Sequence, residues 1–194
     1  MLVLGIDPGT RHLGWGLVER KGNRLQTLAY GVISPDPKLP LAERLVVIEV
    51  ELVAVIERYR PDAAAVESLF FHKDPQAAAK LGHARGVVLL SIARAKVDFF
   101  EYAPAKVKRV IAGGGAAEKR QVALMMKALL GLTDLPRADA TDALALAVTH
   151  LRLGSMAKLA PGSGAVPKTL AKRLPSPRER LLQLAQVARA RRKG

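Results

Sequence analysis

The stretch LVLGIDPGTRHLGWGLVER, residues 2–20, decides the fold. Its first six residues form a short apolar run that ends at Asp-Pro-Gly-Thr, which predicts a buried strand closed by a tight turn. The segments 14–20 and 24–34 flank the turn residues Lys21-Gly22-Asn23 and predict a hairpin. The chain therefore opens with three adjacent strands.

Helices and strands alternate after this opening. Apolar residues recur at helical spacing between residues 41 and 59, and Pro61 ends the helix that this spacing predicts. Short apolar runs predict two further strands at 62–68 and 98–103, and helical patterns occupy 75–96, 104–111, 117–131 and 138–152. Together these elements predict an α/β fold in which a five-stranded mixed sheet is flanked by helices.

Length and composition bound the organisation of the chain. The 194 residues suffice for one compact domain, which we place at residues 1–153. Residues 154–194 are rich in Pro, Gly, Ser and Lys up to about 176, so we expect a basic, largely flexible tail in which 178–192 could form a helix. Neither a membrane span nor a signal peptide is recognisable, and we expect a cytoplasmic protein.

The net charge of +14 predicts a polyanionic partner. Residues 155–194 carry ten Lys or Arg and one acid, so most of the excess lies in the tail. No basic amphipathic segment opens the chain, which favours nucleic acid over a membrane surface. On charge alone, a basic surface that serves solubility or a ribosomal role remains an alternative.

Four acids stand at positions where a site could form. Asp7 ends the first predicted strand and Glu67 ends the fourth, so both emerge at one sheet edge if these strands are neighbours. Asp139 and Asp142 are three residues apart and share a face of the last helix. Close like charges destabilise one another, and no Lys or Arg lies between residues 137 and 152 to neutralise them. We therefore expect a divalent metal ion as their counter-ion.

Convergent carboxylates suit the hydrolysis of a phosphodiester. The reaction needs an activated water on one side of phosphorus and charge relief for the leaving oxygen on the other, and two Mg²⁺ ions provide both. Carboxylate oxygens are the ligands that Mg²⁺ prefers, while the absence of cysteine excludes thiolate zinc sites. Mn²⁺ remains an alternative to Mg²⁺.

Each acid also has an explanation that involves no function. Asp7 could do no more than cap a turn, and Glu67 could be an acid at the start of a helix. Asp139 and Asp142 could be solvated acids favoured by the helix dipole. Only the four together favour a site. The histidines show no metal-ligand spacing, and we interpret them as surface or packing residues: His12, His72, His83 and His150.

Six motifs closely resemble the RuvC Holliday-junction resolvase family over residues 1 to about 153: GIDPGTRHLGWG (5–16), VESLFF (66–71), LGHARG (81–86), FEYAPAKVK (100–108), AEKRQV (117–122) and RADATDALALAVTH (137–150). The resemblance implies a ribonuclease-H-like fold and a crossover junction endodeoxyribonuclease that nicks four-way DNA junctions symmetrically in recombination and repair. It implies a homodimer that works with the branch-migration proteins RuvA and RuvB. It places the catalytic, metal-binding acids at Asp7, Glu67, Asp139 and Asp142.

The resemblance also implies contacts to DNA and to a second subunit. Phe70 matches an aromatic residue that stacks on unpaired bases at the junction centre, and Phe71 is equally available. The small side chains of 75–96 make that helix the candidate dimer interface, and a two-fold dimer would match the approximate symmetry of a junction. Basic residues that hold DNA near the scissile phosphate are matched at Lys108 and Lys119, with Arg109 and Arg120 beside them.

Two features depart from the resemblance. The long basic tail is one, and we expect it to add nonspecific DNA affinity. The other is the apolar segment 112–117, whose flexibility could alter DNA contacts. Three other functions stay open: an ATP-binding protein of the actin and sugar-kinase type, which would need a second domain, an RNA-processing nuclease, and a noncatalytic junction-binding module.

Overall fold

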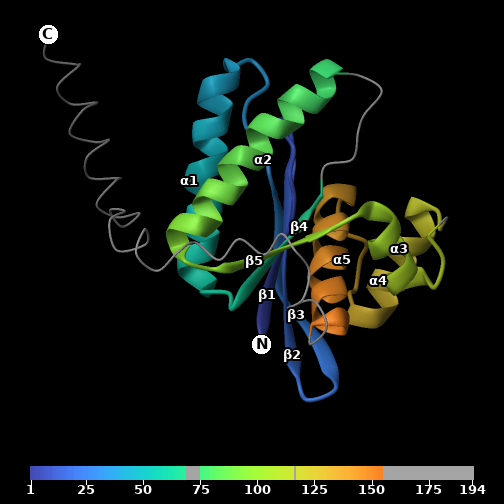
Figure 1. The fold of residues 1–194 in the computed structure, drawn as a ribbon. Helices are drawn as coiled ribbons and strands as arrows, with labels where there is room; N and C mark the ends of the chain where they lie inside the picture. Colours follow the sequence, from blue (N-terminus) through green and yellow to red (C-terminus); the bar gives the residue numbers. More distant parts are fainter. Residues whose placement is uncertain (69–74, 116, 155–194) are drawn as a thin grey trace, which may run out of the picture.

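The computed structural model describes residues 1–68, 75–115 and 117–154, and it consists of one sheet between two layers of helices (Figure 1). The strands are β1 (Leu2–Asp7), β2 (Leu13–Lys21), β3 (Arg24–Ile33), β4 (Ala63–Glu67) and β5 (Asp98–Tyr102). The helices are α1 (Leu41–Tyr59), α2 (Pro75–Ala95), α3 (Pro104–Ala112), α4 (Lys119–Leu130) and α5 (Ala138–Leu153). Every strand and helix predicted between residues 2 and 152 is present, with ends within two residues of the expected ones, and the possible helix at 178–192 lies outside the described residues.

The order of the strands brings the ends of β1 and β4 together. The sheet runs β3-β2-β1-β4-β5, with β2 antiparallel to β1 and β3, and with β4 parallel to β1 and β5. The predicted mixed five-stranded sheet is therefore confirmed. Ile6 pairs with Val66, so Asp7 and Glu67 follow at the same edge of the sheet.

Each face of the sheet has its own hydrophobic core. Along β1, Val3 packs on the side of α5, whereas Leu4 and Ile6 pack on the side of α1 and α2, because successive side chains point to opposite faces. Helices α1 and α2 lie on one side of the sheet in Figure 1, and α3, α4 and α5 lie on the other. Among the described residues, no helix is both long and apolar enough to cross a membrane.

Glycines let α5 lie directly against the backbone of the sheet. A Cβ atom added at Gly5 would collide with the carbonyl oxygen of Ala143, and one added at Gly14 would collide with that of Asp139. Only glycine permits so close an approach. The two contacts fix the height of α5 above β1 and β2, and with it the position of the helix turn that carries Asp139 and Asp142.

Candidate active site

Three carboxylates from three separate elements share one pocket. Asp7 ends β1, Glu67 ends β4 and Asp142 lies on α5, and all three line a cavity of about 210 Å³. Lys108 of α3 and Lys119 of α4 line the same cavity. Its other walls are Pro104, Val107, Val122, Ala145 and Leu146. The structure thus brings together three of the four acids and two of the basic residues that the sequence singled out.

Asp139 does not line this cavity but lies near it. Its charge raises the pKa of both Asp7 and Asp142. Arg137 Nη2 is 3.7 Å from the Asp139 carboxylate, and Lys119 Nζ is 3.7 Å from that of Asp142. The expectation that no basic residue compensates the two aspartates was therefore wrong. Lys119 comes from α4 and Arg137 precedes α5, so neither belongs to the stretch of helix on which that expectation rested.

The electrostatics of the pocket centre on Asp7. The pKa of Asp7 is raised to about 8, mostly by burial and then by the charges of Glu67, Asp142 and Asp139, while Lys119 opposes the increase. Burial also raises the pKa of Asp142, and Lys119 opposes that increase. Among the charges that act on Asp7, those of three acids raise its pKa and that of Lys119 lowers it, so the negative charge around Asp7 exceeds the positive charge. The pocket is therefore suited to accept further cations.

The side chains of this site fit a divalent cation by their chemistry. Carboxylate oxygens are hard donors of the kind that Mg²⁺ and Mn²⁺ bind. Within the described ranges, no three acid or histidine side chains are gathered tightly enough to hold a metal ion as they stand. Asp139 and Asp142 lie beside Arg137 and Lys119 instead, as expected for carboxylates that repel one another.

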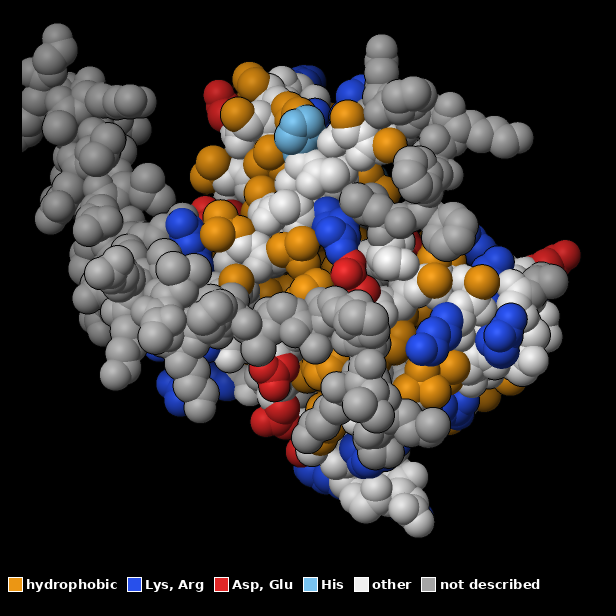
Figure 2. Space-filling view, in the orientation of Figure 1, with side chains coloured by type: hydrophobic (Ala, Val, Ile, Leu, Met, Phe, Trp, Pro, Cys, Tyr) orange, Lys and Arg blue, Asp and Glu red, His pale blue; other side chains and the backbone are white. Residues whose placement is uncertain are grey.

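The other predicted basic residues lie outside the cavity. Arg109 is exposed near the end of α3, and Arg120 is exposed in the first turn of α4. Figure 2 shows Lys and Arg side chains gathered on the surface over these two helices. The pocket therefore opens beside a positively charged surface, although only Lys108 and Lys119 reach into it.

Several predictions fall on residues that the structure does not describe. Phe70, Phe71 and the tail from residue 155 onward all lie outside the described ranges. The candidate dimer helix α2 is described, and a Cβ at Gly82 or Gly86 would meet no heavy atom within 4 Å. Small residues thus leave open space along α2, and its role in a dimer remains a prediction.

A buried histidine links α5 to β5, which the sequence did not reveal. His150 Nδ1 lies 2.8 Å from the hydroxyl oxygen of Tyr102, and the rings of His150 and Phe100 are 4.3 Å apart. Burial lowers the pKa of His150. The interpretation of His150 as a packing residue is confirmed, but its partner lies 48 residues away and no local pattern marks the pair.

Comparison with known sequences identifies close relatives. The family model for crossover junction endodeoxyribonuclease RuvC matches residues 3–150. A protein of that name from Sorangium cellulosum (strain So ce56) is 61% identical over 165 residues, which cover 85% of this chain and 92% of that protein. The one from Myxococcus xanthus (strain DK1622) is 50% identical over 159 residues, covering 81% of this chain and 83% of that protein.

Solved structures agree with these sequence matches. RuvC of Thermus thermophilus in complex with Holliday junction substrate superposes with a TM-score of 0.76 at 42% identity, covering 80% of this chain and 96% of that one. The yeast mitochondrial Holliday junction resolvase, at 11% identity and a TM-score of 0.56, covers 80% of this chain and 81% of that one and shares the fold. The predicted ribonuclease-H-like fold is thereby confirmed. The extent of the family match and the identity of its relatives show that the chain belongs to the RuvC family of crossover junction endodeoxyribonucleases.

Proposed function

We propose that this chain, a Holliday-junction resolving endonuclease by its family, cuts DNA in the pocket lined by Asp7, Glu67 and Asp142. The observation that carries the assignment is the meeting of these three carboxylates with Lys108 and Lys119 in one cavity. Acids that only capped turns or helices would have no reason to converge from separate elements. The relative from Thermus thermophilus, solved with a junction substrate, supports the same substrate for this chain.

Divalent metal ions complete the proposed site. Asp7, Glu67, Asp139 and Asp142 would hold two Mg²⁺ ions, for which Mn²⁺ could substitute, because hard oxygen donors suit both. When bound, the ions would supply an activated water and charge relief for the leaving oxygen. The charges of Glu67, Asp142 and Asp139, which add to the effect of burial on the pKa of Asp7, support this role.

The two lysines of the pocket would hold the scissile phosphate. Lys119 is 81% exposed and lies near Asp142, so it can move to a phosphate oxygen when that carboxylate binds a cation. Lys108 would reach the same strand from α3. Val107 and Val122 would limit the access of bulk water to the reacting phosphate.

Further contacts would bind the rest of the junction. Arg109 and Arg120 would extend the positive surface over α3 and α4 and hold the DNA backbone. Phe70 or Phe71 would stack on unpaired bases at the junction centre. The role of the aromatic residues rests on the motif VESLFF, and the roles of Arg109 and Arg120 rest on their positions beside Lys108 and Lys119, which the motifs FEYAPAKVK and AEKRQV match.

We further propose that the chain acts as a homodimer formed through α2. Two identical sites related by a two-fold axis would cut a two-fold symmetric junction at matched positions. The open space beside Gly82 and Gly86 would let a second copy of α2 approach closely. RuvA and RuvB are the partners that the family resemblance implies.

Cleavage of a synthetic mobile four-way junction tests the proposal. With each strand labelled in turn, purified protein should nick two opposite strands symmetrically in the presence of Mg²⁺ and none in EDTA. Asp142→Asn should bind the junction but fail to cut it, because the variant loses a metal-binding oxygen. Asp98→Asn, which changes an exposed aspartate at the start of β5, should cut normally.

Two results would contradict this proposal. If Asp142→Asn cuts as fast as Asp98→Asn, the pocket is not the site of DNA cleavage. Faster cleavage of structured RNA than of the DNA junction would favour an RNA-processing nuclease instead.

A further inference from the structure

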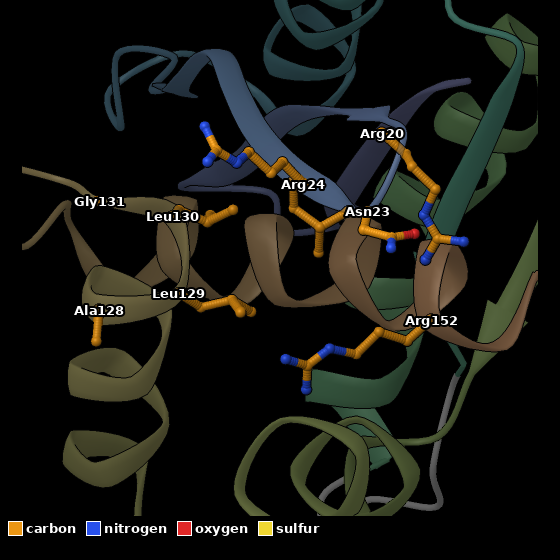
Figure 3. A pocket seen from close by; sticks show the side chains of 9 residues that line it. Arg20, Asn23, Arg24, Ala128, Leu129, Leu130, Gly131 and Arg152 are labelled. Atoms are coloured by element: carbon orange, nitrogen blue, oxygen red, sulfur yellow. The ribbon is translucent and has the colours of Figure 1, made fainter.

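A second cavity lies at the other end of α5. It has a volume of about 600 Å³, within the range of small-ligand pockets. We call it the arginine pocket, because three arginines and three leucines make up most of its lining: Arg20, Arg24, Arg152, Leu25, Leu129 and Leu130. Figure 3 shows that they come from the β2–β3 hairpin, the end of α4 and the end of α5.

The arginine pocket is separate from the acidic one. Asp7 lies five positions along β1 from Leu2, a distance of ~17 Å, and Leu2 pairs with Glu19 beside Arg20. Asp142 lies ten positions along α5 from Arg152, or ~15 Å along the helix. Both measures place the arginine pocket at the opposite end of the sheet from the candidate active site.

Two of its arginines are held in place by the ends of helices. Arg20 Nη2 donates a hydrogen bond to the carbonyl oxygen of Leu151, and Arg152 Nη1 donates one to that of Val110 at 2.9 Å. Each guanidinium has five N–H donors, so both keep donors for a ligand. The side chain of Arg24 makes no hydrogen bond or ion pair with any described residue. No acid lines the pocket among the residues described, so its charge is uncompensated.

The rest of the lining is apolar. Leu25, Leu129 and Leu130 pack against the core beneath α5 but remain partly exposed. In Figure 3, the side chain of Arg152 extends from α5 towards Leu129, so a guanidinium lies beside an apolar wall. A ligand that fills this cavity therefore needs anionic groups and an apolar group together.

We propose that the arginine pocket docks an acidic peptide segment of a partner protein. Carboxylates of the segment would pair with Arg20, Arg24 and Arg152, and guanidinium groups bind carboxylates strongly through paired hydrogen bonds. An apolar side chain of the segment would pack on the leucines. The pocket thus gives the enzyme a protein-docking site remote from the DNA that it cuts.

The charge and shape of the pocket exclude other occupants. Residues 155–194 of the chain carry ten Lys or Arg and one acid, so like charge would repel them from three arginines. A nucleic-acid backbone would gain nothing from the leucine walls. No aromatic side chain is present among the described lining residues to stack on a base.

Fluorescence anisotropy with labelled peptides tests the docking site. The probe is Asp-Asp-Glu-Leu-Phe-Asp, and the two comparison peptides are its uncharged amide counterpart and Asp-Asp-Glu-Ser-Ser-Asp. The full chain should bind the probe more tightly than either comparison peptide. The double variant Arg24→Gln with Arg152→Gln should weaken probe binding at least about tenfold, because two charge-assisted pairs are removed.

A matched control separates this site from general attraction to a basic protein. Lys38→Gln with Arg58→Gln removes the same charge from two exposed positions elsewhere and should change probe affinity less than about twofold. Gln at position 152 keeps a donor for the Val110 carbonyl, and Arg24→Gln alone serves if the double variant fails to fold. Junction cleavage should be unchanged in all of these variants.

Three outcomes would overturn the proposal. Equal binding of the probe and either comparison peptide would show that the pocket does not read carboxylates and an apolar group together. Equal losses in the arginine and control variants would assign the binding to net charge. A loss of junction affinity confined to the arginine variants would make the pocket a DNA contact. None of these outcomes bears on the nuclease pocket, which Asp142→Asn tests separately.

Discussion

Asp7 occupies a position where stability and the proposed function conflict. It is largely buried at the end of the central strand, and three other acids lie close enough to raise its pKa. The sequence predicted the acid and its place, because Asp-Pro-Gly-Thr visibly ends an apolar strand. The approach of Lys119 to Asp142 and of Arg137 to Asp139 could not be predicted, since which residues approach α5 depends on how α4 and the preceding loop pack.

Asp7→Asn should stabilise the protein and abolish cleavage. In metal-free buffer near neutral pH, folding must either bury the charge of Asp7 beside Glu67 and Asp142 or protonate it, and Asn avoids both costs, so we expect the free energy of unfolding to rise by about 1–2 kcal/mol. Adding Mg²⁺ should stabilise the wild type, by ~2.7 kcal/mol at a hundred times its dissociation constant, but the variant much less. Thermal melts with EDTA and with Mg²⁺ measure both effects, with Asp98→Asn as the control. If Asp7→Asn is less stable than the wild type in EDTA, Asp7 does not reduce the stability of the metal-free protein, and the prediction is wrong.

His150 should make stability depend on pH with a predictable sign. Burial lowers its pKa below the ordinary value of 6.5, so the unfolded chain binds a proton at a pH where the folded chain does not. The contribution of His150 is thus complete above pH 6.5 and is lost as the pH falls below that value. Asp7 has the opposite sign, because its raised pKa favours the folded state at low pH.

The difference between the wild type and His150→Gln isolates the histidine. The variant should lose less stability than the wild type between pH 7 and pH 5, because glutamine does not titrate but can still pair with Tyr102. Chemical denaturation at each pH gives the free energies. Parallel pH profiles for the two proteins would show that His150 is not the group that titrates.

At the scale of elements, α5 is the helix on which the fold and the site both depend. It packs on β1 and β2 through Gly5 and Gly14, and it carries two of the four acids. The limits of α5 could be predicted from helical periodicity, and those of β1 and β2 could be predicted from apolar runs. Its height above the sheet could not, because the glycines of GIDPGT and LGWG look like turn residues until the helix is in place.

Gly5→Ala should therefore disrupt the packing of α5. The added methyl would collide with the Ala143 carbonyl, and we expect a loss of about 1–3 kcal/mol together with reduced cleavage, because Asp142 moves with the helix. Gly82→Ala is the matched control, since its Cβ meets open space within a helix and should stabilise the monomer by roughly 0.5–1 kcal/mol. Urea denaturation of both variants checks the comparison. Equal changes in stability for Gly5→Ala and Gly82→Ala would show that the close approach of α5 to β1 does not contribute to stability.

At the scale of the whole molecule, sequence patterns predicted the architecture better than they predicted its surfaces. The order of apolar runs indicated a mixed sheet flanked by helices, because burial on both faces demands continuous apolar strands in the centre. The arginine pocket escaped notice, since its residues come from positions 20–25, 128–131 and 152. Only the folded chain brings such distant positions together, and no periodicity marks them.

Removal of residues 155–194 should change DNA binding but not the fold. The deletion takes away ten Lys or Arg, and the log–log salt dependence of binding should become shallower by ~0.9 for each phosphate that the tail would otherwise neutralise. Junction affinity measured between 50 and 200 mM salt gives the slope, and a thermal melt checks the domain. If both the slope and the affinity stay as in the full chain, the tail has another role.

The hydrogen bond from Arg20 to the Leu151 carbonyl joins residues that are 131 positions apart. During synthesis, α5 can therefore cover the first strands only after residues up to about 153 have been made. Asp142 reaches Asp7 only at that late moment. A nascent or prematurely terminated chain that lacks α5 would hold only two of the four proposed acids, so we expect it to be unable to nick DNA.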